Sequence, residues 1–271
     1  MIRLIAFDMD GTLLNASSDL TPRTQRALQR VMDAGAMISL SSGRMTESML
    51  PIARQIGVNA PMILYNGALI YDHRDGRTLY SRAIPGELAV SIARTVEELG
   101  LYLQVYPGEG FYCAERTGYT KMYEESCRVH CQTLGQPISA WLKGSAVKLL
   151  AIGPAPKVDE ARALLTERFP KGASFFKSRD TFLEMVAEGV DKGQALFALA
   201  DAVGVSMDEV MAFGDEQNDA PMLRAAGCGV AMGNAVELCK AAAQVIAPKN
   251  TEDGVAQVLE AYLDEGRIGG R

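Results

Sequence analysis

The sequence lacks the features that mark membrane, secreted and nucleic-acid-binding proteins. Its 271 residues contain no uncharged apolar run of about eighteen residues, so no membrane-spanning helix is predicted. The apolar start reaches Asp8 too early for a signal-peptide core. A dense Lys/Arg run is also absent, and the formal net charge is -6. Because duplex binding rests on cations that neutralise phosphates, we expect no nucleic-acid partner. Because neither a membrane span nor a signal peptide is predicted, we expect no membrane association and a cytoplasmic location.

Cysteine is scarce and odd in number, which argues against a disulfide framework. In a chain without a secretion signal, reduced thiols are the expected state. A zinc site at Cys127, His130 and Cys131 is less favoured, because no fourth ligand is evident and zinc motifs usually repeat their Cys pairs. The five cysteines are Cys113, Cys127, Cys131, Cys228 and Cys239.

The two ends of the sequence alternate between strands and helices. Such alternation is typical of a parallel sheet with crossover helices. Near the N-terminus we predict strands at 3–7, 36–40 and 61–65 and helices at 21–34 and 46–56, the second bent near Pro51. Near the C-terminus we predict strands at 210–213, 228–231 and 245–247 and helices at 192–203, 220–226, 236–243 and 251–263.

The middle of the sequence has another character, with strands that short turns separate and that therefore favour antiparallel pairing. We predict strands at 101–106, 110–114, 147–152, 174–177 and 182–186, with helices at 87–99 and 158–168 covering one face. The fold class is thus α/β, a doubly wound parallel sheet formed by residues 1–83 and 189–271, with an α+β domain inserted at 84–188.

Polar residues that could take part in catalysis or ligand binding follow the predicted strands of the parallel sheet. Asp8 and Asp10 come after the first strand and Ser42 after the second, while Lys192 begins the first helix after the insertion. The segment 214–219 follows the strand at 210–213 and carries two further aspartates. Ligands of doubly wound sheets bind outside the carboxyl ends of the strands, so these residues are expected to converge on one pocket.

Such a pocket would gather up to four carboxylates, those of Asp8, Asp10, Asp215 and Asp219. Two unit charges 4 Å apart repel by about 4 kcal/mol at an effective dielectric constant near 20. A cation relieves that repulsion, and oxygen ligands without a nearby histidine suit Mg²⁺. Lys192 adds a positive charge, and the Ser42 hydroxyl with the amides around Gly11 and Gly43 can donate to phosphate oxygens.

The doublet Asp8-x-Asp10 indicates two catalytic roles, one for each carboxylate. One carboxylate can attack phosphorus and form an aspartyl-phosphate. The other can protonate the leaving alcohol and then activate water. Gly11 permits an unusual torsion that turns the chain back beneath the site.

Four segments together resemble the motifs of the haloacid dehalogenase superfamily. They are Asp8-Met9-Asp10-Gly11-Thr12, Ser42-Gly43-Arg44, Lys192-Gly193 and Gly214-Asp215-Glu216-Gln217-Asn218-Asp219. An insertion between the second and third motifs is similar to the Cof-type subfamily with its α/β cap of class IIB, and the resemblance covers nearly the whole chain. It implies a Rossmann-like core, with Asp8 as nucleophile and Asp10 as general acid and base.

The resemblance also implies the binding roles. Magnesium would be held by the Asp8 side chain, the Asp10 carbonyl and Asp215, with Asp219 close by. Ser42 and Lys192 would hold the phosphoryl group. Asn66-Gly67 matches a turn common in the subfamily, and Asn66, Asn218 and Arg44 are expected to face the substrate.

The sequence departs mildly from the family pattern. Many relatives have threonine where Ser42 stands, and Ser41 could supply the hydroxyl if the strand ends one residue earlier. Asp10 separates the chain from the dehalogenases, which lack that acid.

We therefore expect a magnesium-dependent phosphatase that hydrolyses a small phosphorylated metabolite, either a sugar phosphate or a phosphorylated cofactor, through an aspartyl-phosphate. Substrate choice is expected to lie in residues 84–188. A phosphomutase of hexose phosphates with a similar cap is the alternative. A binding protein with a decayed site is disfavoured, because Asp8, Asp10, Lys192 and Asp215 are all present.

Overall fold

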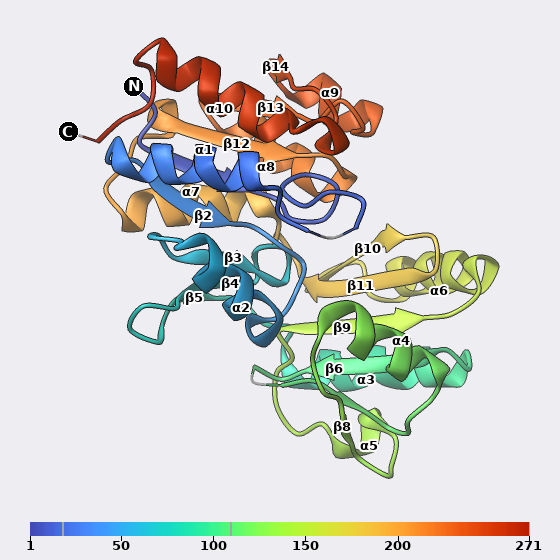
Figure 1. Cartoon of the computed structure of the whole chain (residues 1–271). Coiled ribbons are helices and arrows are strands. Elements are labelled where there is room, and N and C mark those ends of the chain that lie inside the picture. Colours follow the sequence, from blue (N-terminus) through green and yellow to red (C-terminus); the bar gives the residue numbers. More distant parts are fainter. Residues whose placement is uncertain (18, 109, 271) are drawn as a thin grey trace. The chain divides into compact units, whose positions relative to one another are not determined.

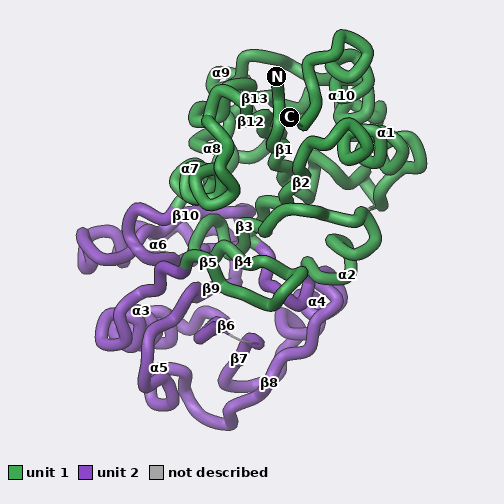
Figure 2. The backbone as a smooth tube through the Cα atoms, turned by 90° about the vertical axis from the view of Figure 1, so that its left-hand side faces the viewer, with its two compact units in different colours: residues 1–43, 49–80, 191–271 green, residues 44–48, 81–190 purple. Residues whose placement is uncertain are grey.

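Residues 1–17, 19–108 and 110–270 are described in the computed structural model, and they fall into two units (Figure 2). The first unit comprises residues 1–43, 49–80 and 191–271. The second comprises residues 44–48 and 81–190. The short segment 44–48 in the second unit has no counterpart in the sequence prediction, which places it in the core.

The first unit is built on a five-stranded sheet in the order β14-β13-β12-β1-β2. All its pairings are parallel, as the sequence predicts. Every residue of β1 is buried, and the Phe7 ring stacks on Phe213 with their centroids 4.9 Å apart. The strands are β1 (Leu4–Phe7), β2 (Met37–Leu40), β12 (Val210–Gly214), β13 (Cys228–Ala231) and β14 (Val245–Ile246).

Helices cover both faces of this sheet. In Figure 2, α7 and α8 lie on one side of the strands and α1 and α10 on the other, and each pair is in mutual contact. The first-unit helices are α1 (Pro22–Asp33), α2 (Thr46–Ile56), α7 (Lys192–Ala202), α8 (Ala220–Ala225), α9 (Glu237–Ala242) and α10 (Gly254–Asp264), although α2 begins within the segment 44–48. The doubly wound α/β fold is therefore confirmed.

The third predicted strand bridges the end of β2 in the parallel sense but belongs to a separate small sheet. It forms β3 (Met62–Leu64) of a small sheet in the order β3-β4-β5, with β4 at Leu69–Asp72 and β5 at Arg77–Ser81. β3 pairs antiparallel with β4, and it meets the end of β2 through a parallel Ser41–Ile63 bridge, where the Ser42 N–H donates to the Ile63 carbonyl at 2.9 Å. The turn Tyr65–Gly67 reverses the chain after β3, and this reversal makes the antiparallel partner available.

The second unit contains a six-stranded sheet in the order β10-β11-β9-β6-β7-β8 (Figure 1). The pairings are antiparallel except for β7 with β8. The helices α3 and α6 contact each other and pack on β6, β9, β10 and β11, as expected. The strands are β6 (Tyr102–Tyr106), β7 (Tyr112–Cys113), β8 (Gln132–Thr133), β9 (Lys148–Ile152), β10 (Ala173–Arg179) and β11 (Phe182–Ala187). The helices are α3 (Gly86–Glu98), α4 (Gly118–Cys127), α5 (Ile138–Trp141) and α6 (Ala155–Arg168).

All five cysteines are buried, and none of them forms a disulfide among the described residues. The Cys113 and Cys131 sulfur atoms lie 3.1 Å apart within the second unit. None of the helices in the described residues has both the length and the apolar character needed to cross a membrane.

Candidate active site

The strand register brings the predicted site segments to one edge of the parallel sheet. Phe7 lies opposite Phe213 on one side and Leu40 on the other. The next residues continue this pairing, because the Asp8 N–H donates to the Phe213 carbonyl and the Ser41 N–H to the Phe7 carbonyl. The segments that carry Asp8, Ser42 and Asp215 therefore leave the sheet side by side.

Three aspartates meet at this edge. Asp8, Asp215 and Asp219 each offer a carboxylate oxygen, and these oxygens lie within 4.8 Å of one another. Their exposed fractions are only 8%, 6% and 0%. Water screens such charges poorly, so the cluster requires a cation or protons.

Lys192 supplies one positive charge inside the cluster. Its ammonium lies 2.5 Å from Asp8 Oδ1 and 2.5 Å from Asp219 Oδ1, and the side chain is fully buried. The residue begins α7, where the Asp191 carboxylate caps the helix by accepting from the Gly193 and Gln194 N–H groups. Burial alone lowers the pKa of Lys192, but the charges of Asp219 and Asp8 outweigh it and leave the pKa raised.

One lysine does not balance three carboxylates, and their pKa values reflect this. Burial raises the pKa of Asp8 well above its usual range, and the charge of Asp219 raises it further against the opposing effect of Lys192. Burial likewise raises the pKa of Asp215 to about 7, although a hydrogen bond from Thr12 opposes the shift. Without a further cation, these carboxylates therefore take up protons more readily than exposed ones.

Both oxygens of Asp219 have partners. Oδ1 pairs with Lys192, and Oδ2 accepts from the N–H groups of Asp215 and Glu216 at 3.0 and 2.9 Å. Asp219 thus fixes both the lysine and the loop that carries Asp215.

In the loop after β1, Thr12 binds the Asp215 carboxylate and Gly11 leaves room for it. The Thr12 hydroxyl donates to Asp215 Oδ1 at 2.7 Å and is buried. Gly11 has φ of +85°, and a Cβ there would lie 2.3 Å from Asp215 Oδ2. The sequence does not predict this contact of Thr12, because its partner lies 203 positions away and only the folded sheet brings the two together.

Ser42, Gly43, Asn66 and Asn218 form a second polar group in the first unit. The Asn66 N–H donates to the Ser42 carbonyl, and the Asn218 amide donates to Asn66 Oδ1 at 2.9 Å. A Cβ at Gly43 would lie 2.8 Å from Asn66 Oδ1, so glycine is needed for this contact. Asn66 adopts φ of +59° and is 2% exposed, and its Nδ2 has no hydrogen-bond partner among the described residues.

The remaining predicted residues have less defined places. Asp10 is half-buried and forms a bridge with Leu14 next to the aspartate cluster. Ser41 and Ser42 are both buried, and Ser41 Oγ has no hydrogen-bond partner among the described residues. Arg44 is half-buried and belongs to the second unit. The roles predicted for these residues stay predictions.

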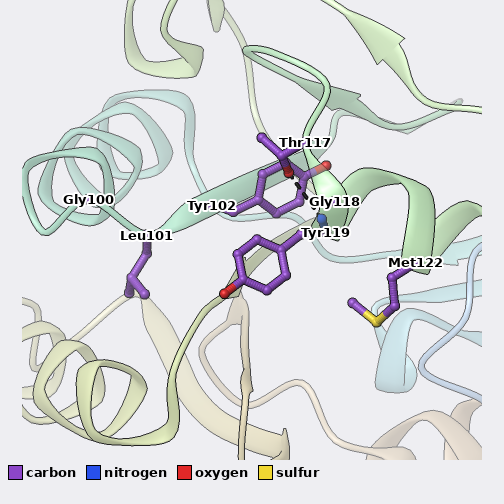
Figure 3. Close-up of a pocket in the computed structure, with 7 residues that line it drawn as sticks. All are labelled: Gly100, Leu101, Tyr102, Thr117, Gly118, Tyr119 and Met122. Atoms are coloured by element: carbon purple, nitrogen blue, oxygen red, sulfur yellow. Dashed lines mark hydrogen bonds between the residues drawn. The ribbon is translucent and has the colours of Figure 1, made fainter.

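The second unit has a separate cavity of about 740 Å³ (Figure 3). The Tyr102 and Tyr119 rings line it with their centroids 5.8 Å apart. None of the predicted site residues lines this cavity, whose lining consists of Gly100, Leu101, Tyr102, Thr117, Gly118, Tyr119 and Met122.

The sequence matches a family model of haloacid dehalogenase-like hydrolases over residues 5–259. Because the match spans most of the chain, the protein belongs to this family of hydrolases.

Relatives indicate the type of hydrolase. A putative phosphatase of Haemophilus influenzae is 32% identical over 98% of this chain and 100% of its own length. The HMP-PP phosphatase of Yersinia enterocolitica is 30% identical over 99% of this chain and 98% of its own. The pyridoxal phosphate phosphatase YbhA of Escherichia coli is 28% identical over 96% and 98%. The protein is a phosphatase of this family.

Solved structures support the fold. A haloacid dehalogenase-like hydrolase from Bacteroides thetaiotaomicron superposes with a TM-score of 0.89 and 29% identity, covering 96% of this chain and 99% of its own. The similarity therefore extends over both units.

Proposed function

We propose that the protein is a magnesium-dependent phosphatase that hydrolyses a small phosphorylated metabolite through an aspartyl-phosphate on Asp8. The observation that carries the proposal is the buried contact of Lys192 with Asp8 beside Asp215 and Asp219. It combines a carboxylate nucleophile, a fixed cation for phosphoryl oxygens and a carboxylate pair suited to a metal.

The donor set fits magnesium. Its members are carboxylates with no histidine or thiolate among them, and hard divalent cations prefer oxygen ligands. We assign the Asp8 side chain, the Asp10 carbonyl and Asp215 as ligands. When bound, the ion would offset the carboxylate charges and draw electron density from phosphoryl oxygens. Asp219 is part of the predicted metal set, but its oxygens already engage Lys192 and two backbone amides, so we assign it an anchoring role.

We assign the two chemical steps of the reaction to Asp8 and Asp10. Lys192 engages Asp8 Oδ1, so Oδ2 is the oxygen that we assign to attack on phosphorus. Asp10 protonates the leaving alcohol and then removes a proton from the water that cleaves the acyl phosphate.

A second group of residues would hold the substrate. Ser42, Lys192 and the amides near Gly11 and Gly43 would bind phosphoryl oxygens. Asn66 Nδ2 is a buried donor without a described partner, which supports a contact of Asn66 with a substrate oxygen. Asn218 would orient that amide, and Arg44 is the further candidate for substrate contact.

For the substrate we propose a phosphorylated cofactor or sugar phosphate. The names of the relatives, which include a pyridoxal phosphate phosphatase and HMP-PP phosphatases, favour the cofactor class. Residues 84–188 would determine which leaving group is accepted.

The test is phosphate release from a panel of phosphorylated metabolites, with and without metal. We expect activity to disappear in EDTA and to return with Mg²⁺. Ca²⁺ should restore it poorly, because calcium prefers more ligands and a looser geometry. Full activity in chelator would refute the metal role, and a preference for Zn²⁺ would point to another kind of site.

A further inference from the structure

Asn234 lies in the loop between β13 and α9, outside every segment that the sequence prediction singled out. Its Nδ2 group donates to the Gly11 carbonyl at 2.8 Å and lies 3.5 Å from Asp215 Oδ2. Its Oδ1 atom accepts from the Asn250 N–H at 3.0 Å. The amide therefore faces both the loop after β1 and the loop after β12, although the side chain is exposed.

The backbone around Asn234 is tied to the same loops. The Val236 N–H donates to the Asp215 carbonyl at 2.9 Å. On the other side, the Asn250 side chain donates to the Leu14 carbonyl at 2.9 Å. Asn234 and Asn250 thus bind the loop 10–14 through the Gly11 and Leu14 carbonyls, while Val236 binds the loop that carries Asp215.

The orientation of the amide follows from its neighbours. The reverse orientation would bring Oδ1 against the Gly11 carbonyl and the Asp215 carboxylate, and would place Nδ2 against the Asn250 N–H. Because two acceptors or two donors repel each other, only the orientation with Nδ2 toward Gly11 satisfies all three neighbours.

We propose that Asn234 is a positioning residue for the magnesium site, an inference that rests on the function proposed above. The Nδ2 donor holds the Gly11 carbonyl, and with it the adjacent Asp10 carbonyl, at a fixed distance from the Asp215 carboxylate. The oxygens that would bind the ion are thereby arranged before it arrives. Residues that orient metal ligands typically contribute about 10- to 100-fold to metal affinity or activity.

The experiment uses the full chain, made metal-free and titrated with MgCl₂. Two readings are taken: the rate of p-nitrophenyl phosphate hydrolysis at saturating ester, and the rise in Tm. For Asn234→Ala we expect a rise of about tenfold in two quantities: the Mg²⁺ concentration that half-saturates the rate, and the Mg²⁺ concentration that produces a fixed rise in Tm. KM for the ester at saturating Mg²⁺ should change by less than about threefold, because the residue acts on the metal site. An increase below about fivefold in either titration overturns the proposal.

Asn234→Asp separates hydrogen-bond donation from charge. It keeps the shape of the side chain but places a carboxylate oxygen against the Gly11 carbonyl and Asp215. If donation matters, this variant also binds Mg²⁺ at least fivefold more weakly, despite its added negative charge. Affinity equal to or above that of wild type overturns the proposal. If Asn234→Ala does not fold, this isosteric variant carries the test.

Gln29→Ala is the matched control, because it removes an exposed amide that donates to Asp33 within α1. Its Mg²⁺ midpoint should equal that of wild type. If wild type shows no magnesium-dependent hydrolysis, the proposed function fails. The thermal titration then decides the Asn234 proposal alone.

Discussion

Lys192 is a single, fully buried residue that joins two acidic groups, Asp8 and Asp219. If Asp8 is the nucleophile, Asp8→Asn should reduce phosphate release by at least about a thousandfold, because an amide oxygen is a far poorer nucleophile than a carboxylate. The fold should persist, since asparagine keeps the shape and its oxygen can still accept from Lys192. Steady-state rates and far-UV circular dichroism measure the two effects.

The control for this variant is Asp264→Asn, which makes the same chemical change at an exposed residue paired with Arg30. It should retain the wild-type rate. Activity of Asp8→Asn within tenfold of wild type, in a preparation free of host phosphatases, would remove Asp8 from the nucleophile role.

Asp215 gives a prediction for pH. Burial raises its folded-state pKa from 3.8 to about 7, so between these values the metal-free folded protein keeps a proton that the unfolded chain has lost. Its contribution to stability is therefore complete below about pH 4 and is lost as the pH rises toward 7. In EDTA, the Tm of Asp215→Asn relative to wild type should rise between roughly pH 5 and pH 8. A difference that is constant or falls with pH would show that Asp215 ionises normally.

At the scale of elements, the sequence predicts those parts whose cause is local. Apolar runs identify β1, β2 and β12, and the polar residues directly after them identify the strand-end cluster. The start of α1 is also predicted correctly, because a capping Thr followed by Pro is a local signal.

Elements with a weak local signal, or with a partner that is distant in sequence, are not predicted. The sequence does not predict α4 and α5, because α4 has little amphipathic pattern and α5 spans a single turn. β3 bridges β2 in the parallel sense, as the sequence predicts, but it pairs mainly with β4, because the reversal after β3 makes that antiparallel partner available. The contacts of Thr12 and Asn234 with Asp215 are likewise created by the fold, although their position near strand ends was a usable signal.

The cap of α1 allows a prediction on stability. Thr21 Oγ1 accepts from the Thr24 N–H at 3.2 Å and lies 2.5 Å from Asp253 Oδ1. Thr21→Ala removes these contacts and the one with the Thr24 hydroxyl, so the free energy of unfolding should fall by about 1–2 kcal/mol. Urea denaturation measures the loss, and kcat should be unchanged. The control Gln29→Ala, in the same helix, should cost less than about 0.5 kcal/mol. Equal losses for both variants would mean that the Thr21 cap makes no specific contribution to the free energy of unfolding.

At the scale of the whole molecule, the chain forms two units, and the second includes a short segment that is distant in sequence from the rest of it. The second unit consists of residues 81–190 together with residues 44–48. Among the contacts of this segment, Glu47 Oε1 accepts from the Gly110 N–H at 3.0 Å, and the Ser48 hydroxyl donates to the Cys127 carbonyl at 2.8 Å. Both join residues more than sixty positions apart, which no local sequence pattern could reveal.

The last prediction concerns the inserted block 84–188, which we expect to determine substrate choice. Replacing it with a short Gly/Ser linker should cost far more rate on the best metabolite of the panel than on p-nitrophenyl phosphate. A metabolite draws binding energy from groups remote from phosphorus, whereas the small generic ester has little to lose. Because Glu47 and Ser48 lose their partners in this variant, Glu47→Ala with Ser48→Ala in the full chain is the matched control, and it should leave the ratio of the two rates unchanged. If the shortened chain is folded, as judged by circular dichroism, and both substrates lose rate by the same factor, specificity resides in the first unit instead.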